Sequence, residues 1–416
     1  MNETVVHLST NNQSIPRTMV SAYEALELVL DATVERPVVD LPIFEAIGLV
    51  LAEPILADRD YPPFDRAMMD GYAVPEGAEK QKLRVVGEAA AGRPAETGPT
   101  NGCCIEIMTG APCPAGTYAV VMKEQVHCLG DEVLIPDRIN PGQHIALQGS
   151  DCQAGQVVLQ AGDRIDSFSV AVLASLGKTA VHVIRRPRIG IITTGMELIA
   201  PEADPGPFQI RDGNGPMLAI MARDIGVEGP VVLNAGDEVN SILSKLEPVA
   251  HCDIVILTGG VSAGRYDLVP AALKQYGAEV IFHKVCQKPG KPLLVASRVD
   301  QLVFGLPGNP LACHLCFHRY VAPAVRKMQG LNPIRTVYFG RLMEAVQRKR
   351  GRAYFVPGIV GASAGAGELP LLRPVPGKSS ADVFQSCGAN CYLEIPPGSA
   401  AVPAGDRVGF TLFDDI

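Results

Sequence analysis

Three lysines lie close together in a chain whose formal net charge is −8: Lys284, Lys288 and Lys291. Lys288 and Lys291 flank Pro289-Gly290, a rigid turn that presents both ammonium groups from one edge. Solvated surface lysines are the alternative, but prolines beside the lysines do not suit a flexible surface loop. We therefore expect this loop to bind a small, highly charged anion. A local cluster of cations in an acidic chain is not the broad basic surface that nucleic acid requires.

A glycine-rich loop follows the apolar run DIVIL at residues 253–257. Glycine lets backbone N–H groups converge on an anion because no Cβ stands in the way. The loop is neither a Walker loop, because it has no Gly-Lys-Ser/Thr ending, nor a GxGxxG motif, so a plain turn is the alternative. We expect five of its residues to contact a phosphate-like group: Thr258, Gly259, Gly260, Ser262 and Gly264.

Three carboxylates follow the ends of predicted strands: Glu197, Asp237 and Asp267. The carboxyl ends of parallel strands meet at one edge of a sheet, so these side chains should converge there. Carboxylate oxygens beside a phosphate-binding loop are natural ligands for Mg²⁺. Together the three carboxylates suggest a divalent cation and its triphosphate- or diphosphate-like ligand. Salt bridges or helix capping are the alternative role for each of them alone.

A third loop follows the apolar run LVFGL and consists of Pro307, Gly308, Asn309 and Pro310. Asn309-Pro310 is a favourable N-cap and N1 pair, which predicts a helix after it. The helix contains Cys313-x-x-Cys316 with histidines nearby, a pattern that also occurs in zinc sites. No second ligand pair follows at a recognisable spacing, so we interpret the segment as a helix packed on a sheet.

Residues 188–329 alternate between apolar strand-like runs and amphipathic helical runs. This alternation predicts a three-layer α/β/α domain with a mostly parallel sheet and helices on both faces. The capping box Ser21-x-x-Glu24 predicts a helix to about Ala32, and a second helix is expected over residues 42–51. Residues after 330 alternate with period two between Gly/Pro turns, which predicts a β domain.

The loop at residues 63–74 holds two aspartates, Asp65 and Asp70, between aromatic side chains. Asp70-Gly71 is compatible with a simple turn, so the chemistry of this loop is ambiguous from the sequence. The length of 416 residues predicts several domains. The polar N-terminus has no secretory h-region and no apolar run is long enough to span a bilayer. Eleven scattered cysteines favour reduced thiols, so we expect a cytoplasmic protein without membrane or nucleic-acid partners.

Taken together, the motifs resemble the molybdopterin molybdenumtransferase family, which includes bacterial MoeA and the E domain of gephyrin. The matching segments occur in the family's order over nearly the whole chain: PPFDRAMMDGYAV, GEAAAGRP, IMTGAPCPAG, TTGMEL, GNGPMLA, LTGGVSAGRYD, FHKVCQKPGKP, GLPGNP, GRAYF and AGDRVGF. The resemblance implies four domains and a homodimer with the active site at the subunit interface. Their predicted bounds are 1–50 with 138–184 for an elongated discontinuous domain, 51–137 for a β-rich inserted domain, 185–330 for the α/β domain, and 331–416 for a β-barrel-like domain.

The resemblance also implies a reaction in which molybdate and adenylylated molybdopterin yield molybdenum cofactor and AMP with the help of Mg²⁺. An upstream adenylyltransferase is a possible partner. On the family pattern, functional positions are occupied by Asp65, Thr109, Asp151, Glu197, Asp237, Asp267, Lys284, Lys288, Pro307 and Pro310. Asp237 and Asp267 would hold the metal and the nucleotide. Lys288 and Lys291 would bind molybdate or phosphate, and Asp65 would complete the cleft across the dimer interface. Rate acceleration would come from positioning and charge neutralisation rather than from a covalent nucleophile.

Four positions depart from the family's usual residues. The family usually has Asp at Met196 and at Tyr118, often a second Asp at Arg265, and often Ser at Ala312. These changes alter charge near the predicted metal and remove one hydroxyl, and we interpret the chain as a divergent but active member. A non-catalytic scaffold and a pterin adenylyltransferase are the competing functions.

Overall fold

The structure is a computed structural model that describes residues 17–261, 268–363, 367–375, 377–398 and 401–414. The chain divides into two compact units. Unit 1 comprises Met1–Val39, Gly48–Val50 and Val183–Ile416, and unit 2 comprises Asp40–Ile47 and Leu51–His182. None of the helices in the described ranges is both long and apolar enough to cross a membrane.

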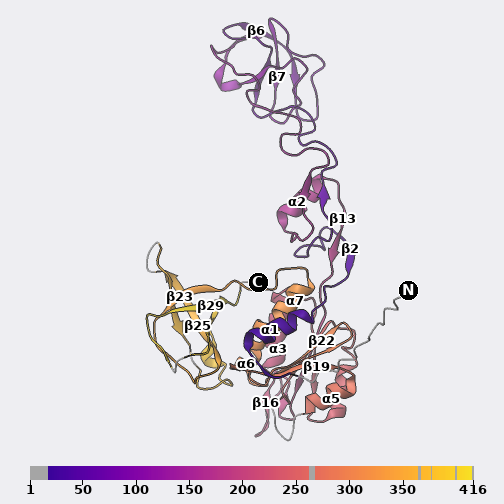
Figure 1. Ribbon diagram of the computed structural model, residues 1–416. Helices are drawn as coiled ribbons and strands as arrows, with labels where there is room; N and C mark the ends of the chain where they lie inside the picture. Colours follow the sequence, from indigo (N-terminus) through magenta and orange to yellow (C-terminus); the bar gives the residue numbers. More distant parts are fainter. Residues whose placement is uncertain (1–16, 262–267, 364–366, 376, 399–400, 415–416) are drawn as a thin grey trace, which may run out of the picture. The chain divides into compact units, whose positions relative to one another are not determined.

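A seven-stranded sheet forms the centre of unit 1 (Figure 1). Its order is β1 (Arg17–Val20), β19 (Glu279–Val285), β21 (Leu294–Arg298), β22 (Gln301–Leu306), β18 (Ile254–Thr258), β14 (Ile189–Thr194) and β17 (Val231–Ala235). Four neighbouring pairs are parallel, and only β21 is antiparallel to its neighbours. A short turn at Val299-Asp300 joins β21 to β22, and so short a connection permits only an antiparallel pair. The predicted mostly parallel sheet is confirmed.

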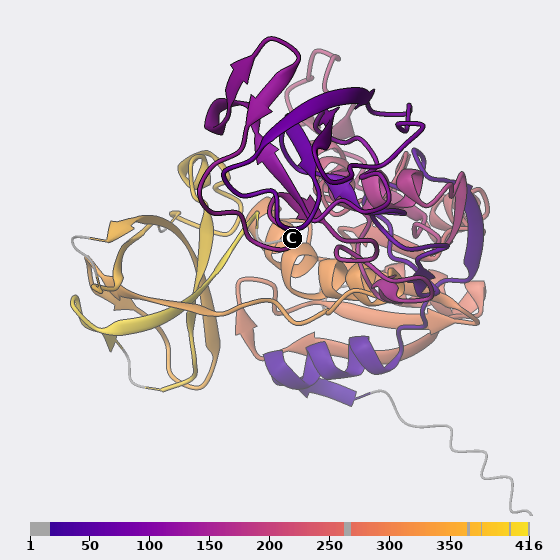
Figure 2. The same cartoon turned by 90° about the horizontal axis from the view of Figure 1, so that it is seen from above.

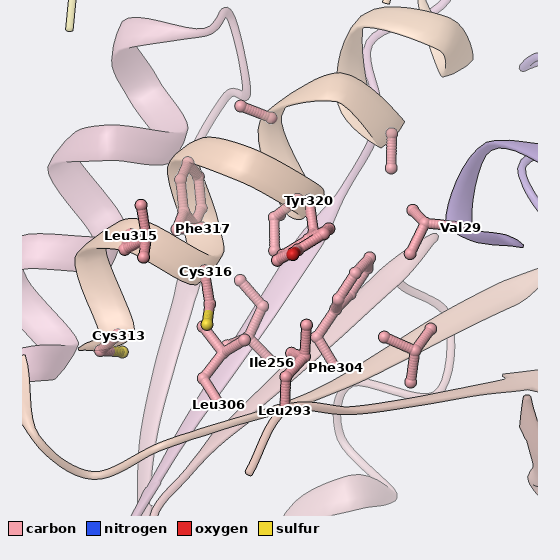
Figure 3. Packing of buried hydrophobic residues seen from close by; sticks show 14 of the residues in the cluster. Val29, Ile256, Leu293, Phe304, Leu306, Cys313, Leu315, Cys316, Phe317 and Tyr320 are labelled. Carbon is pink, nitrogen blue, oxygen red and sulfur yellow. The ribbon is translucent and has the colours of Figure 1, made fainter. Parts of the chain in front are cut away.

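Helices cover both faces of this sheet, which confirms the three predicted layers. One face packs against α1 (Ala22–Asp31), α3 (Asn214–Asp224), α6 (Pro310–Cys316), the π-helical turn η2 (Phe317–Val321) and α7 (Ala322–Met328). The other packs against α4 (Val239–Leu246) and α5 (Leu268–Tyr276). Alternation along β18 explains the division, because Ile256 lies in the first cluster and Leu257 in the second. Figure 3 shows Cys316, Phe317 and Tyr320 in the first cluster with Ile256, Phe304 and Leu306 of the sheet.

The closing helix was expected to be continuous, but it widens into a π turn between α6 and α7. The N–H of Ala322 bonds to the carbonyl of Phe317, five residues earlier. Pro323 supplies the physical reason, because its ring nitrogen has no hydrogen to donate to the preceding turn.

The N-terminal segment belongs to unit 1. The capping box is present: the amide of Glu24 donates to Ser21 Oγ at 3.1 Å, and the amide of Ser21 to Glu24 Oε2 at 3.5 Å. Strand β1 pairs in parallel with β19, whereas the sequence analysis grouped residues 1–50 with 138–184. The four-domain division stays a prediction. The expected helix over residues 42–51 is wrong: β2 (Val38–Pro42) is followed by turns, and Gly48 has a φ of 80° that ends any helical run.

The C-terminal region of unit 1 is a closed five-stranded barrel, as Figure 2 shows for the orange and yellow strands. Its strands are β25 (Ala353–Ser363), β26 (Pro370–Pro374), β23 (Tyr338–Leu342), β29 (Arg407–Leu412) and β27 (Cys391–Ile395), and β27 pairs back with β25. Short β24 (Val346–Gln347) pairs with β28 (Ala401–Val402), and η3 spans Phe384–Ser386. The predicted β-barrel-like domain is confirmed.

Unit 2 contains a six-stranded sheet and several short ribbons. The sheet order is β8 (Ala119–Met122), β5 (Gly71–Val74), β7 (Cys103–Ile107), β6 (Lys82–Ala89), β10 (Glu132–Leu134) and β9 (His127–Leu129). The ribbons pair β4 (Arg66–Ala67) with β11 (Ile145–Ala146), and β3 (Ile55–Leu56) with β12 (Val157–Leu159). Helix α2 (Ser167–Ser175), η1 (Lys123–Gln125) and β13 (Ala180–Ile184), which pairs with β2, complete the elements before β14. The predicted β-rich region is confirmed.

Candidate functional site

The loops expected to bind ligand begin at one edge of the unit 1 sheet. In the parallel register, Thr193 lies opposite Thr258, and Thr258 opposite Leu306. The loops after β14, β18 and β22 therefore start side by side. Strand β19 points the same way as β22, because β21 lies between them and is antiparallel to both. The lysine loop after β19 consequently starts at this edge as well.

Glycine 259 is required by the close approach of the neighbouring loop. Its φ is +90°, and a Cβ built on it would lie 2.7 Å from both the carbonyl oxygen and Oγ1 of Thr194. Thr194 Oγ1 in turn donates to the carbonyl of Thr258 at 3.0 Å. The first residue after β18 is thus packed against the last residue of β14 with no space for a side chain.

We expect Gly259→Ala to lower the free energy of unfolding by about 2–4 kcal/mol, because positive-φ strain adds to a steric clash with backbone. The matched control is Gly277→Ala, at a φ of +80° with nothing within 4 Å of the added Cβ. The control should lose only the strain contribution, about 1–2 kcal/mol. Urea denaturation followed by circular dichroism measures both. Equal losses would show that contact with Thr194 is not what requires glycine.

Asn214, at the start of α3, joins two of the predicted loops. Its Nδ2 donates to the carbonyl of Gly308 at 2.7 Å and to Thr258 Oγ1 at 3.3 Å. Asp212 orients this turn, because its Oδ1 accepts from the amides of Asn214 and Gly215 at 3.0 Å each. Neither residue was predicted to belong to the site. The available signal was an Asp two residues before an Asn-Gly-Pro helix start.

Two of the three predicted carboxylates lie together beyond β14 and β17. Asp237 Oδ2 accepts from the amide of Met196 at 3.2 Å. The carboxylate of Glu197 lies over Gly195, where a Cβ would come within 2.7 Å of Oε2. The backbone of Glu197 is held by the amide of Ile210 at 2.8 Å, next to the pairing of β15 (Leu198–Ile199) with β16 (Ile210–Arg211).

The predicted metal site is only partly within the described residues. Asp267, with Ser262 and Gly264 of the glycine loop, lies outside them. Among the residues that the structure describes, no group of three or more His, Cys, Asp or Glu side chains could hold a metal ion. Glu197 and Asp237 nevertheless provide carboxylate oxygens from neighbouring strand ends, which is the ligand type that Mg²⁺ prefers. The ligand type of these two carboxylates suits Mg²⁺, and the metal site stays a prediction.

The lysine loop folds back on β19 and presents Lys288 to solvent. The amide of Lys284, which has a φ of 78°, donates to the carbonyl of Leu293 at 2.8 Å. The amide of Val285 donates to the carbonyl of Lys291 at 2.8 Å. Lys284 and Lys291 are half-buried, whereas Lys288 is exposed and its Nζ lies 5.5 Å from the centre of the Tyr354 ring.

Lys288 lines a cavity of about 320 Å³ between the lysine loop and the barrel. Its polar lining from the barrel comprises Glu344, Gln347, Lys378, Ser379 and Ser380. The barrel loop is tied to the Pro307–Pro310 turn, because Asn309 Nδ2 donates to Ser380 Oγ at 2.7 Å and the amide of Leu311 to the Ser380 carbonyl at 3.1 Å. Two lysines and two serine hydroxyls in one cavity suit a small oxyanion. These barrel residues were not predicted to belong to the site.

The predicted residues of unit 2 fall into two neighbouring groups. Asp65 Oδ1 accepts from the amide of Gln148 at 2.8 Å. Arg66 Nη2 lies 3.9 Å from Asp151 Oδ2, in an exposed ion pair beside the β4–β11 ribbon.

Thr109 is engaged with the second aspartate of the 63–74 loop. Asp70 Oδ1 accepts from the amide of Thr109 at 2.7 Å and from its hydroxyl at 2.6 Å. These hydrogen bonds, the side-chain one first, lower the pKa of Asp70. Asp70 therefore holds the Thr109 loop rather than forming an isolated Asp-Gly turn.

Cys313, Cys316 and His314 of the closing helix have different surroundings. Cys313 and Cys316 are buried in the hydrophobic core between the sheet and the helices that cover its first face. His314 Nδ1 instead lies 2.8 Å from the hydroxyl of Tyr392 in the barrel. Burial, aided by the charge of Arg335, lowers the pKa of His314 to about 4, so the ring is neutral. The segment packs as a core helix, which agrees with the helical interpretation.

Three family models cover most of the chain. The MoeA N-terminal region (domains I and II) matches residues 20–177, the probable molybdopterin-binding domain residues 190–327, and the MoeA C-terminal region (domain IV) residues 340–413. A molybdopterin molybdenumtransferase of Staphylococcus epidermidis is 33% identical over 405 residues, which is 95% of this chain and 96% of that protein. The chain belongs to the molybdopterin molybdenumtransferase family. A relative of the same name from Synechocystis is 32% identical over 94% of this chain and 99% of its own length.

The solved structures of this family agree with the fold. A crystal structure of a molybdopterin biosynthesis MoeA protein from Pyrococcus horikoshii covers 95% of this chain and all of its own, with a TM-score of 0.78 and 32% identity. Another MoeA crystal structure from Pyrococcus covers 95% of this chain and 99% of its own, with a TM-score of 0.82 and 29% identity.

The positions expected to depart from the family's usual residues have different surroundings. Met196 is 76% exposed beside Asp237, whereas Ala312 is buried in α6. Tyr118 is half-buried in unit 2, and Arg265 lies outside the described residues.

Proposed function

We propose that this chain acts in molybdenum cofactor biosynthesis by inserting molybdate into adenylylated molybdopterin in a Mg²⁺-dependent step that releases AMP. The observation that supports it best is the meeting of three loops and two carboxylates at one sheet edge, next to a cavity lined by Lys288. A diphosphate, a divalent cation and a tetrahedral dianion each have a matching set of groups there. Family membership makes the same substrates the natural choice.

The glycine loop after β18 and the Pro307–Pro310 turn are proposed to hold the diphosphate of the adenylylated pterin. Gly259 has a φ of +90° and packs against Thr194, which fixes the course of the loop backbone as it leaves β18. Asn214 bonds to both loops and so keeps them together. Backbone N–H groups arranged in this way favour an anion without the mobility of a lysine side chain.

Asp237, with Asp267 and with Glu197 nearby, is proposed to hold Mg²⁺. When bound there, the cation would neutralise charge that develops on the phosphate leaving group. The contribution of the protein is to fix the carboxylates in advance. The hydrogen bond from the Met196 amide fixes Oδ2 of Asp237, so Oδ1 is the oxygen proposed to bind the cation.

Lys288, together with Lys378, Ser379 and Ser380 of the barrel, is proposed to bind molybdate. The cavity is larger than one tetrahedral oxyanion, so it leaves space for part of the pterin. Lys284 and Lys291 are proposed to add positive charge from the strand and the loop. Asp65, Thr109 and Asp151 are proposed to complete the cleft from the second subunit of a cytoplasmic homodimer, which an adenylyltransferase would supply with substrate.

The decisive experiment incubates the purified chain with adenylylated molybdopterin, Mg²⁺ and molybdate, and quantifies AMP by chromatography. We expect AMP release that requires both molybdate and Mg²⁺. Replacing molybdate with tungstate in a parallel reaction measures the oxyanion preference. Intact pterin nucleotide after incubation would contradict the proposal and favour a scaffold function. Synthesis of the nucleotide from ATP and free molybdopterin would instead indicate an adenylyltransferase.

A further inference from the structure

The residue just before Lys288 is a fully buried amide. Gln287 is 0% exposed, although it lies in β20 (Gln287–Lys288), a two-residue strand that pairs in parallel with β25. Side chains alternate along a strand, so the inward Gln287 and the outward Lys288 are fixed by the same piece of backbone. Whatever holds Gln287 therefore also sets the direction of Lys288.

Tyr320 and Cys316, both on the closing helix, hold the Gln287 amide. The hydroxyl of Tyr320 donates to Gln287 Oε1 at 2.5 Å, and Gln287 Nε2 lies 3.8 Å from Cys316 Sγ. Figure 3 shows Cys316 and Tyr320 in the core above the sheet. Burial raises the pKa of Tyr320 far above its ordinary value, so the hydroxyl stays protonated and remains a donor. A buried amide without such partners would be costly, so the pairing constrains where Gln287 can lie.

The turn of the lysine loop closes directly on the same amide. Gly290 has a φ of +90°, and a Cβ built on it would lie 2.7 Å from Gln287 Nε2 and from Cys316 Sγ. The loop backbone between Lys288 and Lys291 is therefore in contact with the Gln287 side chain. One buried group supports the loop at its first residue and at its turn.

We propose that Gln287 and Tyr320 are positioning residues that fix Lys288 in the geometry for binding the tetrahedral oxyanion. The inference rests on the proposed function of Lys288 as the molybdate ligand. Neither residue touches the substrate in this assignment. They act through the lysine-loop backbone, which the Tyr320 hydroxyl anchors to the closing helix. A mere contribution to core stability is the competing explanation, because both side chains are buried.

The test compares Gln287→Met, Tyr320→Phe and the double variant in the full chain. Tyr320→Phe leaves Gln287 Oε1 without its donor, and Gln287→Met leaves the Tyr320 hydroxyl only its longer contact of 3.4 Å with the Ala22 carbonyl. Each change should therefore loosen the loop and lower the melting temperature. Isothermal calorimetry with sodium molybdate should show a dissociation constant about five- to tenfold larger in both single variants. This is the range expected for the loss of one buried hydrogen bond. The KM for molybdate in AMP release should rise equally, with kcat changed less than twofold.

The double variant separates positioning from stability. With both polar partners replaced by apolar groups, the melting temperature should recover toward that of the natural chain. Molybdate binding should stay weak, because no hydrogen bond anchors the loop. Tyr392→Phe is the matched control: it removes a buried tyrosine hydroxyl in the same core cluster, whose partner is His314 rather than the lysine loop. It should leave the molybdate affinity unchanged.

Two results would overturn the inference. One is molybdate affinity in the Gln287 and Tyr320 variants equal to that of the natural chain; the other is affinity that simply follows the melting temperature across all four variants. A natural chain that binds no molybdate also overturns it. If the natural chain binds molybdate but releases no AMP, only the proposed reaction is contradicted. The calorimetry then still tests whether Gln287 and Tyr320 position Lys288.

Discussion

Replacing Asp253 with asparagine should lower the free energy of unfolding by about 3–5 kcal/mol, the loss typical of breaking a buried ion pair. Asp253 is 6% exposed at the start of β18. Its Oδ1 accepts from Arg36 Nη1 at 2.8 Å, and both its oxygens accept from Arg185 at 2.7 Å. An asparagine would turn an N–H group toward guanidinium donors and leave their charges without a counter-ion. The chain has no tryptophan, so circular dichroism in urea is the suitable measurement.

The position of this cluster explains why the effect should be large. Arg36 lies shortly before the first point where the chain leaves unit 1, after Val39, and Arg185 shortly after its last return at Val183, so one carboxylate holds the unit 1 ends of both segments. The control is Asp204→Asn, which removes an exposed pair with Arg211 at 3.4 Å and should change stability little. A similarly small loss in the Asp253 variant would contradict the anchoring role.

The stability that Asp253 provides should also depend on pH. Burial would raise the pKa of Asp253, but hydrogen bonds from Arg185, the Arg188 amide and Arg36 outweigh it and lower the pKa below the ordinary value. A carboxyl whose folded pKa is depressed stabilises the fold above its unfolded pKa of about 3.9, and this stabilisation disappears as pH falls through the folded pKa. The difference between the natural chain and Asp253→Asn should therefore be full at pH 7 and shrink below about pH 4.

Replacing Asp237 with asparagine should lower kcat for AMP release about 100-fold or more, because a preorganised charge at the reacting phosphate is lost. The substitution separates two roles. An asparagine Oδ1 can still accept the amide of Met196, so the loop after β14 should keep its conformation. It cannot supply the negative charge that a magnesium ligand requires. A titration of AMP release against Mg²⁺ should show a higher half-saturating concentration.

Glu238→Gln is the matched control for this experiment. Glu238 is the next residue, it is exposed, and its side chain makes no cap hydrogen bond at the start of α4. The control should retain the rate and the Mg²⁺ dependence of the natural chain. If Asp237→Asn behaves like the control, Asp237 serves only as the acceptor for Met196, and the proposed metal site is wrong.

Local sequence patterns predicted most of the elements correctly. The capping box at Ser21 and Glu24 depends on residues three apart, and the strand and helix periods of residues 188–329 depend on near neighbours. The expectation for residues 42–51 was wrong because apolar spacing alone does not show that Gly48 adopts a positive φ. The antiparallel direction of β21 was not predicted. It follows from the short connection to β22, whereas the composition of a strand does not show its direction.

Residues whose role depends on partners far along the chain were not predicted. Asn214 looks like part of a helix start, yet its amide contacts residues 44 and 94 positions later. Ser380 looks like part of a surface loop, yet it bonds to Asn309, 71 positions earlier. Gln287 adjoins a predicted site lysine, and nothing in its neighbours along the chain shows that Tyr320 holds it.

Residue types at short spacing predicted the alternating strands and helices of residues 188–329, the glycine turns at Gly259 and Gly290, and the family, because each depends on near neighbours along the chain. The tertiary structure decided which side chains meet. It brought Glu197 beside Asp237, Lys288 beside the serines of the barrel, and Gln287 under the turn of the lysine loop. Contacts of this kind depend on strand order and on the packing of helices over the sheet, which bring together residues that are far apart in the chain and share no local pattern.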